Sequence, residues 1–268
     1  MSVIRLAGAT RRFFDRTGVG PIDLALADGE FVAIVGPSGC GKSLLVDLIG
    51  GLERCDDGAV LVDGVHVHGP NPDRQIVFQD GGLFPWLTVE QNVAFGLRAR
   101  GDKATDVTKA VDAMLALVDL QRVAHLYPLE LAASMRQRTA IARALILRPP
   151  VLLLDDPFAA LDEVARSRMQ QELARLWTST GATAIFVTHN VAEACVLADR
   201  VVVLTTGPGR VAGVIDVRHE RPRSTDVVAD EIERVSALLR EQITREGVAD
   251  SESLAGTLVY RSPRRHLG

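Results

Sequence analysis

A glycine-rich loop at residues 36–43 constrains the fold of this chain more than any other segment. It reads Gly36-Pro37-Ser38-Gly39-Cys40-Gly41-Lys42-Ser43 and fits the pattern G-x-x-x-x-G-K-[ST]. An apolar run precedes it and a helical pattern begins at Lys42, so the loop joins a strand to a helix. Glycines permit a tight loop whose N–H groups point inward at phosphate oxygens. The segment therefore predicts a nucleoside triphosphate site.

The polar residues at the end of this loop have separate expected roles. Lys42 supplies a positive charge for the β- and γ-phosphates, and the Ser43 hydroxyl is a Mg²⁺ ligand. The N-terminus of the following helix adds partial positive charge. We interpret Cys40 as a small space-filling residue. The nucleotide contacts predicted from this segment are Gly36, Pro37, Ser38, Gly39, Cys40, Gly41, Lys42, Ser43 and Leu44.

Short apolar runs alternate with helical patterns along most of the chain, which predicts an α/β fold. Several runs are apolar on both faces, as in buried strands of a largely parallel sheet. The predicted strands span 3–7, 22–26, 31–35, 75–78, 151–154, 183–187 and 201–204, and the predicted helices span 42–49, 163–178 and 190–198.

The middle of the chain differs, because its pattern is helical from about 89 to 147. An amphipathic stripe there is interpreted as core packing; it consists of Val107, Val111, Met114, Leu115 and Val118. We predict a discontinuous nucleotide-binding core from residues 1–86 and 150–220, a helical subdomain over 87–149, and a C-terminal helix with a flexible tail over 221–268. The basic segment at 261–266 is expected to be disordered.

A pair of aspartates, Asp155 and Asp156, follows the apolar run at 151–154. A buried strand that ends in a carboxylate places Asp155 beside the Mg²⁺ held by Ser43. The next residue, Asp156, is placed to orient or deprotonate the attacking water as a general base.

The order and spacing of further segments resemble the ATP-binding subunits of ABC transporters over residues 3–215. The resemblance implies a P-loop NTPase (RecA-like) core with N-terminal antiparallel strands and a helical subdomain, and ATP with Mg²⁺ as cofactors. It implies that Gln79 senses Mg²⁺ and the attacking water, and that His189 contacts the γ-phosphate. Phe13 or Phe14 is expected to stack on adenine. The segment 83–89 resembles the part that touches the membrane subunit, and Ala159-Ala160-Leu161-Asp162 resembles the loop that crosses the dimer interface.

A finer similarity is to importers of nitrate, aliphatic sulfonates and taurine. It rests on Pro85-Trp86-Leu87-Thr88-Val89 and Gly207-Pro208-Gly209-Arg210. The resemblance implies a second ATPase subunit, integral membrane permease subunits and an extracytoplasmic solute-binding protein as partners. It also implies a peripheral location on the inner face of the cell membrane.

The signature segment departs from the family pattern L-S-G-G followed by Gln or Met. Ala132 replaces the serine that bonds the γ-phosphate on the opposite subunit, and a hydrogen bond to a charged group contributes about 1.5–3 kcal/mol. Ala133 adds a Cβ where glycine allows close approach, and Ser134 replaces the second glycine. We expect Ser134 to cap the signature helix, with Gln137 completing a capping box; the alternative is a direct phosphate contact by Ser134.

Aspartate at 156 is a second departure, because the family usually has glutamate there. The shorter side chain keeps the carboxylate but loses reach, so slower hydrolysis is expected. Asp156 affects the site on this chain's own loop, whereas the altered signature acts on the site of a partner. We therefore expect slow hydrolysis by a homodimer, or pairing with a more complete partner.

Overall properties limit the remaining alternatives. The net charge of −4 argues against a nucleic-acid partner, and the three cysteines form no C-x-x-C pair. No signal-peptide core or bilayer-length apolar run is present, which predicts a cytoplasmic chain.

One alternative function is an ATP-binding regulatory subunit that barely hydrolyses ATP. A soluble ATPase of DNA repair or translation normally needs two such domains or long coiled-coil insertions, and the signature helix with Gln79 disfavours a GTPase or small-molecule kinase.

Overall fold

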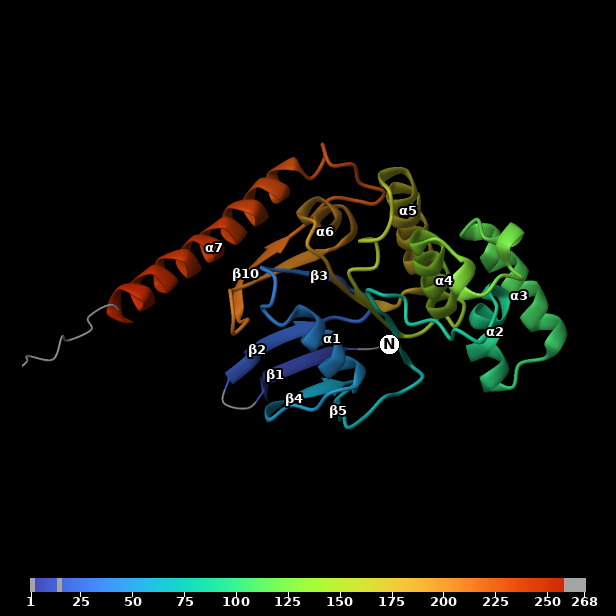
Figure 1. The fold of residues 1–268 in the computed structure, drawn as a ribbon, viewed down its shortest axis with the longest axis horizontal. Helices are drawn as coiled ribbons and strands as arrows, with labels where there is room; N and C mark the ends of the chain where they lie inside the picture. The colour runs from blue at the N-terminus through green and yellow to red at the C-terminus, as the bar shows by residue number, and fades with distance from the viewer. Residues whose placement is uncertain (1–2, 14–15, 258–268) are drawn as a thin grey trace, which may run out of the picture.

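The computed structural model describes residues 3–13 and 16–257, which build two β-sheets flanked by helices (Figure 1). Phe14 and the tail at 261–266 lie outside the described residues. The larger sheet has six strands, of which β10 at one edge is antiparallel to β9 and the others are parallel. In spatial order they are β10 (Val211–Asp216), β9 (Arg200–Leu204), β3 (Phe31–Val35), β8 (Thr183–Val187), β7 (Val151–Asp155) and β6 (Arg74–Val77).

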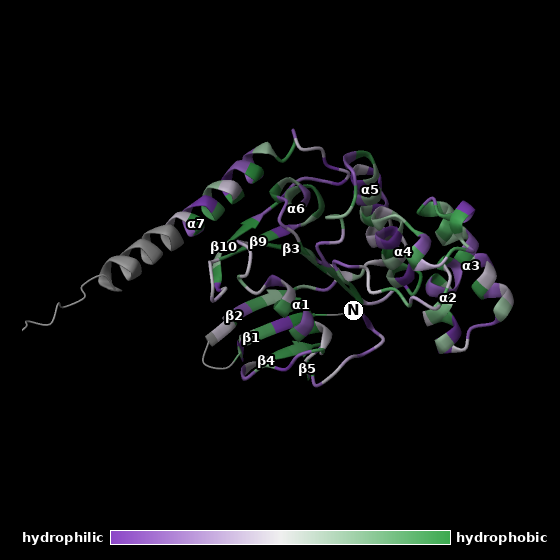
Figure 2. Cartoon of the chain, in the orientation of Figure 1, coloured by the Kyte–Doolittle hydropathy of each residue, from purple (hydrophilic) through white to green (hydrophobic). Residues whose placement is uncertain are grey.

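The central strands are buried on both faces, as their continuous apolar sequence predicts. On β3, Val32 and Ile34 face one hydrophobic cluster, while Phe31 and Val35 face another. Figure 2 shows the hydrophobic residues concentrated on these inner strands. In the sheet the neighbouring strands β3, β8, β7 and β6 are parallel, so their carboxyl ends lie at one edge, where α/β sheets bind ligands.

The smaller sheet is antiparallel. Its buried apolar side chains belong to the same hydrophobic cluster as Val32 and Ile34. Helix α1 (Lys42–Gly50) packs between the two sheets, contacting strands of both, and buries Leu45, Leu48 and Ile49. The strand order is β2 (Arg16–Leu26), β1 (Ile4–Phe13), β4 (Asp57–Val62) and β5 (Val65–His66).

Between β6 and β7 the chain is mainly helical, and these helices lie at the opposite end of the molecule from the C-terminal helix α7 (Ala229–Thr257) (Figure 1). The expected stripe on α3 is confirmed as core packing, since four of its five residues are buried and Met114 is partly buried. The elements are α2 (Val89–Arg100), α3 (Ala104–Leu117), the short helices η1 (Gln121–Val123) and η2 (Pro128–Glu130), and α4 (Ala133–Leu145).

Three further helices complete the described residues: α5 (Glu163–Thr180), α6 (Val191–Leu197) and α7 (Ala229–Thr257). Helix α6 packs on β3 and α7, and α7 covers β9 and β10 before projecting from the body (Figure 1). The boundaries proposed for the core, the helical subdomain and the C-terminal region remain predictions.

Candidate nucleotide-binding site

The glycine-rich loop leaves β3 and enters α1 through backbone conformations that require glycine. Gly41 forms the N-cap of α1 with φ of 97°. A Cβ at Gly41 would lie 2.8 Å from both the Gly18 carbonyl oxygen and the Val19 Cβ. A Cβ at Gly209 would collide with the Cys40 carbonyl oxygen, so the segment between β9 and β10 packs closely against the loop at this glycine. Sequence reasoning assigned no such role to Gly18 or Gly209, because only the folded chain brings them to the loop.

The Lys42 ammonium group lies inside the loop. Its Nζ donates hydrogen bonds to the carbonyl oxygens of Gly36 at 2.9 Å and Pro37 at 2.8 Å. Since Gly41 carries no side chain, no side-chain cap from the N-cap residue covers the N-terminus of α1, where an anion can bind. Cys40 is fully buried, and this burial raises the pKa of its thiol. The neutral thiol fits the space-filling interpretation.

Oxygen donors suited to Mg²⁺ lie beside the loop. Asp155 ends β7 and is largely buried, which raises the pKa of its carboxyl group, while a hydrogen bond from Ser43 lowers it. Within the described residues no group of three or more His, Cys, Asp or Glu side chains could hold a metal ion. Magnesium is commonly bound by one or two carboxylates together with substrate phosphates. The Ser43 hydroxyl and Asp155 carboxylate therefore fit a Mg²⁺ ion that arrives with a nucleotide.

A cavity of about 370 Å³ joins the loop to residues from four other segments. The Phe13 ring is half exposed, and its edge lies 3.0 Å from where a Cβ on Gly18 would be. The cavity brings together most of the predicted site residues, namely Phe13, Ser38, Gly39, Gly41, Lys42, Ser43, Leu44, Gln79, Asp155, Asp156 and His189. Gly36, Pro37 and Cys40 lie behind this surface, within the loop.

Asp156 and His189 meet at the carboxyl ends of β7 and β8. The Asp156 N–H donates to the Val187 carbonyl at 2.8 Å, and the His189 Nε2 lies 3.8 Å from the Asp156 Oδ2. Asp156 has φ of 45°, a conformation that aspartate adopts more readily than most residues. The Thr188 Oγ1 lies 3.3 Å from the Asp156 Oδ1. The imidazole is half exposed and lines the cavity.

Gln79 follows β6 on a loop that hydrogen bonds from α4 hold in place. The Gln137 Nε2 donates to the Phe78 carbonyl at 3.1 Å. Arg143 donates to the carbonyls of Gly82 at 2.8 Å and Gly81 at 3.2 Å. Helix α4 therefore holds the loop that presents Gln79 to the cavity.

A family model described as ABC transporter matches residues 19–159. The chain belongs to this family. It is 46% identical over 205 residues to the nitrate import ATP-binding protein NrtC of Synechocystis sp., covering 75% of this chain and 31% of NrtC. It is 39% identical over 213 residues to the nitrate import ATP-binding protein NrtD of Synechococcus elongatus, covering 78% of each. The chain thus spans about a third of the length of NrtC but most of that of NrtD.

A solved structure gives the same result. The dimeric post-hydrolysis state of the ATP-binding cassette MJ0796, bound to ADP and Pi, superposes with a TM-score of 0.72 at 29% identity. The match covers 82% of this chain and all of that chain, so the predicted P-loop NTPase fold is confirmed. The ABC family binds ATP with Mg²⁺, in agreement with the oxygen donors of Ser43 and Asp155.

The signature helix of this ABC chain begins earlier than expected. Its N-cap is Ala132, whose methyl group accepts no hydrogen bond, and α4 starts at Ala133. Ser134 therefore lies inside the first turn, and the Gln137 amide reaches Phe78. The predicted Ser134 cap and its capping box are wrong, because Ala132 has the extended backbone of an N-cap and its carbonyl already accepts from the Arg136 N–H, which leaves Ser134 inside the helix. Ser134 does not line the cavity on its own chain's phosphate loop.

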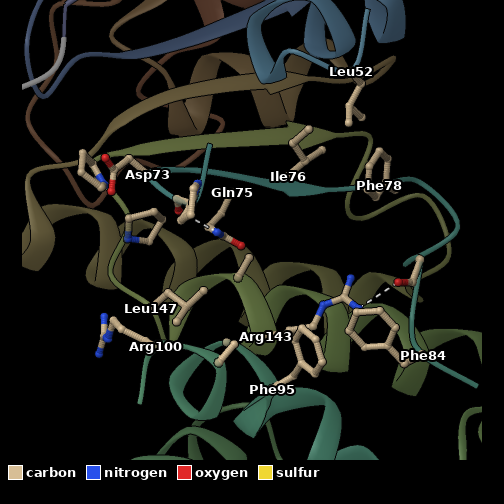
Figure 3. A pocket seen from close by; sticks show the side chains of 17 residues that line it. Leu52, Asp73, Gln75, Ile76, Phe78, Phe84, Phe95, Arg100, Arg143 and Leu147 are labelled. Atoms are coloured by element: carbon tan, nitrogen blue, oxygen red, sulfur yellow. Dashed lines mark hydrogen bonds between the residues drawn. The ribbon is translucent and has the colours of Figure 1, made fainter. Parts of the chain in front are cut away.

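A groove of about 680 Å³ is lined by Phe78 and Phe84, which lie on either side of Gln79 in the sequence (Figure 3). The Phe84 and Phe95 rings lie 4.5 Å apart between centroids, and the Arg143 guanidinium lies 5.2 Å from the Phe84 centroid. Trp86 packs against Phe84 and is 69% exposed beside the groove. We call this the aromatic groove; its lining includes Leu52, Gln75, Ile76, Phe78, Phe84, Phe95, Arg143 and Leu147.

Proposed function

We propose that the chain is the ATP-binding, energy-coupling subunit of an ABC-type importer, and that it hydrolyses ATP at a head-to-tail dimer interface. One observation carries the proposal: Lys42, Ser43, Gln79, Asp155, Asp156 and His189 meet in one cavity from separate segments. A phosphate loop alone is shared by many activities, whereas this combination suits phosphoryl transfer to water.

The residues of the cavity divide the chemistry among them. Lys42 and the N–H groups of the loop hold the β- and γ-phosphates, and Phe13 stacks on the adenine. Ser43, Asp155 and Gln79 would hold Mg²⁺, which would supply positive charge against the phosphates. Asp156 takes a proton from the attacking water as general base, and His189, close to the Asp156 carboxylate, contacts the γ-phosphate.

The dimer supplies the remaining part of each site in this proposal. The N-terminus of α4 would face the ATP held by a second ATPase subunit, either another copy of this chain or a different partner. Because Ala132 places no side-chain cap on α4, the N–H groups of Ala133 and Ser134 are available to a phosphate, whereas those of Met135 and Arg136 donate to the Ala132 carbonyl. This arrangement supports a trans contact through the backbone even without the family's serine hydroxyl.

The aromatic groove supports coupling to a permease. Its exposed aromatic rings favour an amphipathic helix of an integral membrane subunit. No described helix of this chain is long and apolar enough to cross a membrane. We propose a peripheral position on the inner face of the cell membrane, reached through that permease.

The cargo is proposed to be a small oxyanion such as nitrate or an aliphatic sulfonate, delivered by an extracytoplasmic solute-binding protein. The similarity to NrtC and NrtD supports this class. A nucleic-acid partner is not part of the proposal. Co-expression with permease and binding-protein candidates from neighbouring genes tests it: nitrate- or sulfonate-stimulated ATPase activity in proteoliposomes supports it, and indifference to both contradicts the cargo class.

The second candidate is a regulatory subunit that binds ATP and hydrolyses little of it. The methyl side chain at the α4 N-cap favours this candidate, because no hydroxyl reaches the partner's phosphate from there. Restoring Ser-Gly-Gly at 132–134 separates the two. If the chain is a hydrolysing, energy-coupling subunit, its ATPase rate is expected to increase by no more than about 10-fold, which is near the lower limit for one hydrogen bond to a charged group. If the chain is a regulatory subunit, its ATPase rate is expected to increase far more, because the wild type hydrolyses almost no ATP.

A further inference from the structure

A buried glutamate behind the candidate site has no role in the function proposed above. Glu193 lies on α6, with its side chain only 6% exposed. Its Oε2 lies 3.0 Å from the Thr188 Oγ1, and the same hydroxyl lies 3.3 Å from the Asp156 Oδ1. Thr188 therefore bridges the buried glutamate and the proposed general base.

The hydrogen-bonding capacity of one hydroxyl limits how this bridge is formed. A threonine hydroxyl donates one proton and accepts two hydrogen bonds. The Asn190 N–H donates to the Thr188 Oγ1 at 3.1 Å, which occupies one acceptor position. Two ionised carboxylates would compete for the single hydroxyl proton. A protonated Glu193 removes the competition, because it donates to Thr188 and leaves the Thr188 proton for Asp156.

The surroundings of Glu193 favour this arrangement. Burial raises the pKa of its carboxyl group, and the Asp156 charge acts in the same direction. Hydrogen bonds with Thr188 and Gln170 and the charge of Arg166 act in the opposite direction. The Arg166 Nε lies 3.4 Å from the Glu193 Oε1. The Arg166 Nη2 also donates to the Leu161 carbonyl at 2.9 Å, within the 159–162 segment that is expected to cross the dimer interface.

We propose that Glu193 is a positioning residue for ATP hydrolysis, which orients the Asp156 carboxylate through Thr188 and connects it to segment 159–162 through Arg166. The inference rests on the proposed function, in which Asp156 activates water. A shift of this segment on dimer closure would reach Asp156 through Arg166, Glu193 and Thr188. The Asp156 carboxylate would then be aligned for hydrolysis only when the second ATPase subunit is bound.

Single-turnover hydrolysis of MgATP by the full chain tests the inference, with nucleotide affinity and melting temperature measured on the same samples. Glu193→Ala is expected to lower the hydrolysis rate about 10–100-fold, the range for a misplaced catalytic group, with ATP affinity changed less than about 3-fold. Glu193→Gln is expected to recover most of the rate, since its amide donates to Thr188. The matched control is Glu172→Ala on α5, a mostly buried acid paired with Arg175, which leaves the rate unchanged.

Thr188→Val removes the hydroxyl while keeping the shape of the side chain. It is expected to match Glu193→Ala, and the double variant to be no slower than either, because both changes break one connection. Additive losses would overturn the inference, as would equal losses of rate and ATP affinity in Glu193→Ala, or no recovery in Glu193→Gln. A wild-type chain that binds ATP without hydrolysing it would instead overturn the proposed function, and the inference with it.

Discussion

At Gly41 the backbone itself makes the phosphate loop possible. A left-handed φ is unfavourable for residues with a Cβ by about 1–2 kcal/mol, and at Gly41 a Cβ would also collide with Gly18 and Val19. Gly101, the C-cap of α2, has a similar φ of 86° with open space around it.

Comparing alanine at these two glycines separates backbone strain from damage to the site. Gly101→Ala is expected to lower stability by about 1 kcal/mol without changing ATP affinity. Gly41→Ala is expected to lower stability further and to weaken ATP binding by more than about 10-fold, since the loop must move. Thermal unfolding and fluorescent-nucleotide titration measure both effects. Equal ATP affinity in the two variants would show that the loop tolerates the displaced backbone.

The length of the side chain at 156 is expected to limit turnover. Asp156→Glu extends the carboxylate by one methylene toward the cavity, and a gain in reach of about 1 Å is expected to raise the single-turnover rate by roughly 10-fold. ATP affinity is expected to stay the same, because the phosphates are held by the loop. A rate equal to or below that of the wild type would mean that the shorter acid fits the site, with Thr188 already orienting it.

Among the elements, those with one dominant local signal were predictable from sequence. Strands β3 and β8 have the predicted bounds because each is a short apolar run buried on both faces. Strand β4 was missed, since its first residues are Asp57 and Gly58, and β5 has only two residues. Strand β10 was missed because its half-exposed sequence follows no strict alternation.

The start of α4 shows a different limit of sequence reasoning. Ser134 and Gln137 have the residue types and spacing of a capping box, and local sequence favours that cap. The folded chain instead uses Gln137 to hold the Phe78 carbonyl 59 positions away. No local pattern contains a contact of such separation. The phosphate loop was predictable for the opposite reason, since the residue types that form it all lie within residues 36–43.

The aromatic groove provides a prediction for α2 and the Gln79 loop. Phe95→Asp puts a charge among aromatic rings, and is expected to abolish binding to the permease while leaving basal ATP hydrolysis unchanged. The control is Val65→Asp on β5, where the valine is 68% exposed and outside the groove. Pull-down of neighbouring-gene permease subunits from detergent-solubilised membranes measures binding. Loss in both variants, or in neither, would contradict the docking role of the groove.

For the whole molecule, the proposed head-to-tail dimer predicts complementation between inactive variants. Asp156→Asn disables the site on its own chain, whereas Ser134→Glu places a negative charge beside the partner's phosphates at the N-terminus of α4. Each variant alone is expected to be inactive. In a symmetric dimer, an equal mixture is expected to recover about a quarter of wild-type activity, because half of the dimers contain one intact site.

A matched mixture controls for nonspecific recovery. Lys42→Ala and Asp156→Asn both damage the site on their own chain, so their mixture leaves every site with one defect and stays inactive. Recovery in this control, or none in the Asp156→Asn and Ser134→Glu mixture, would contradict a site shared between subunits.

Single-turnover hydrolysis of MgATP by an excess of the purified chain tests most directly whether this site hydrolyses ATP. The wild type is expected to release phosphate from bound ATP. Asp156→Asn is expected to bind ATP equally well and to release phosphate at least about 100-fold more slowly, as expected for loss of a general base. Equal rates in the two proteins, or no phosphate from wild-type chain that holds ATP, would contradict hydrolysis by Asp156.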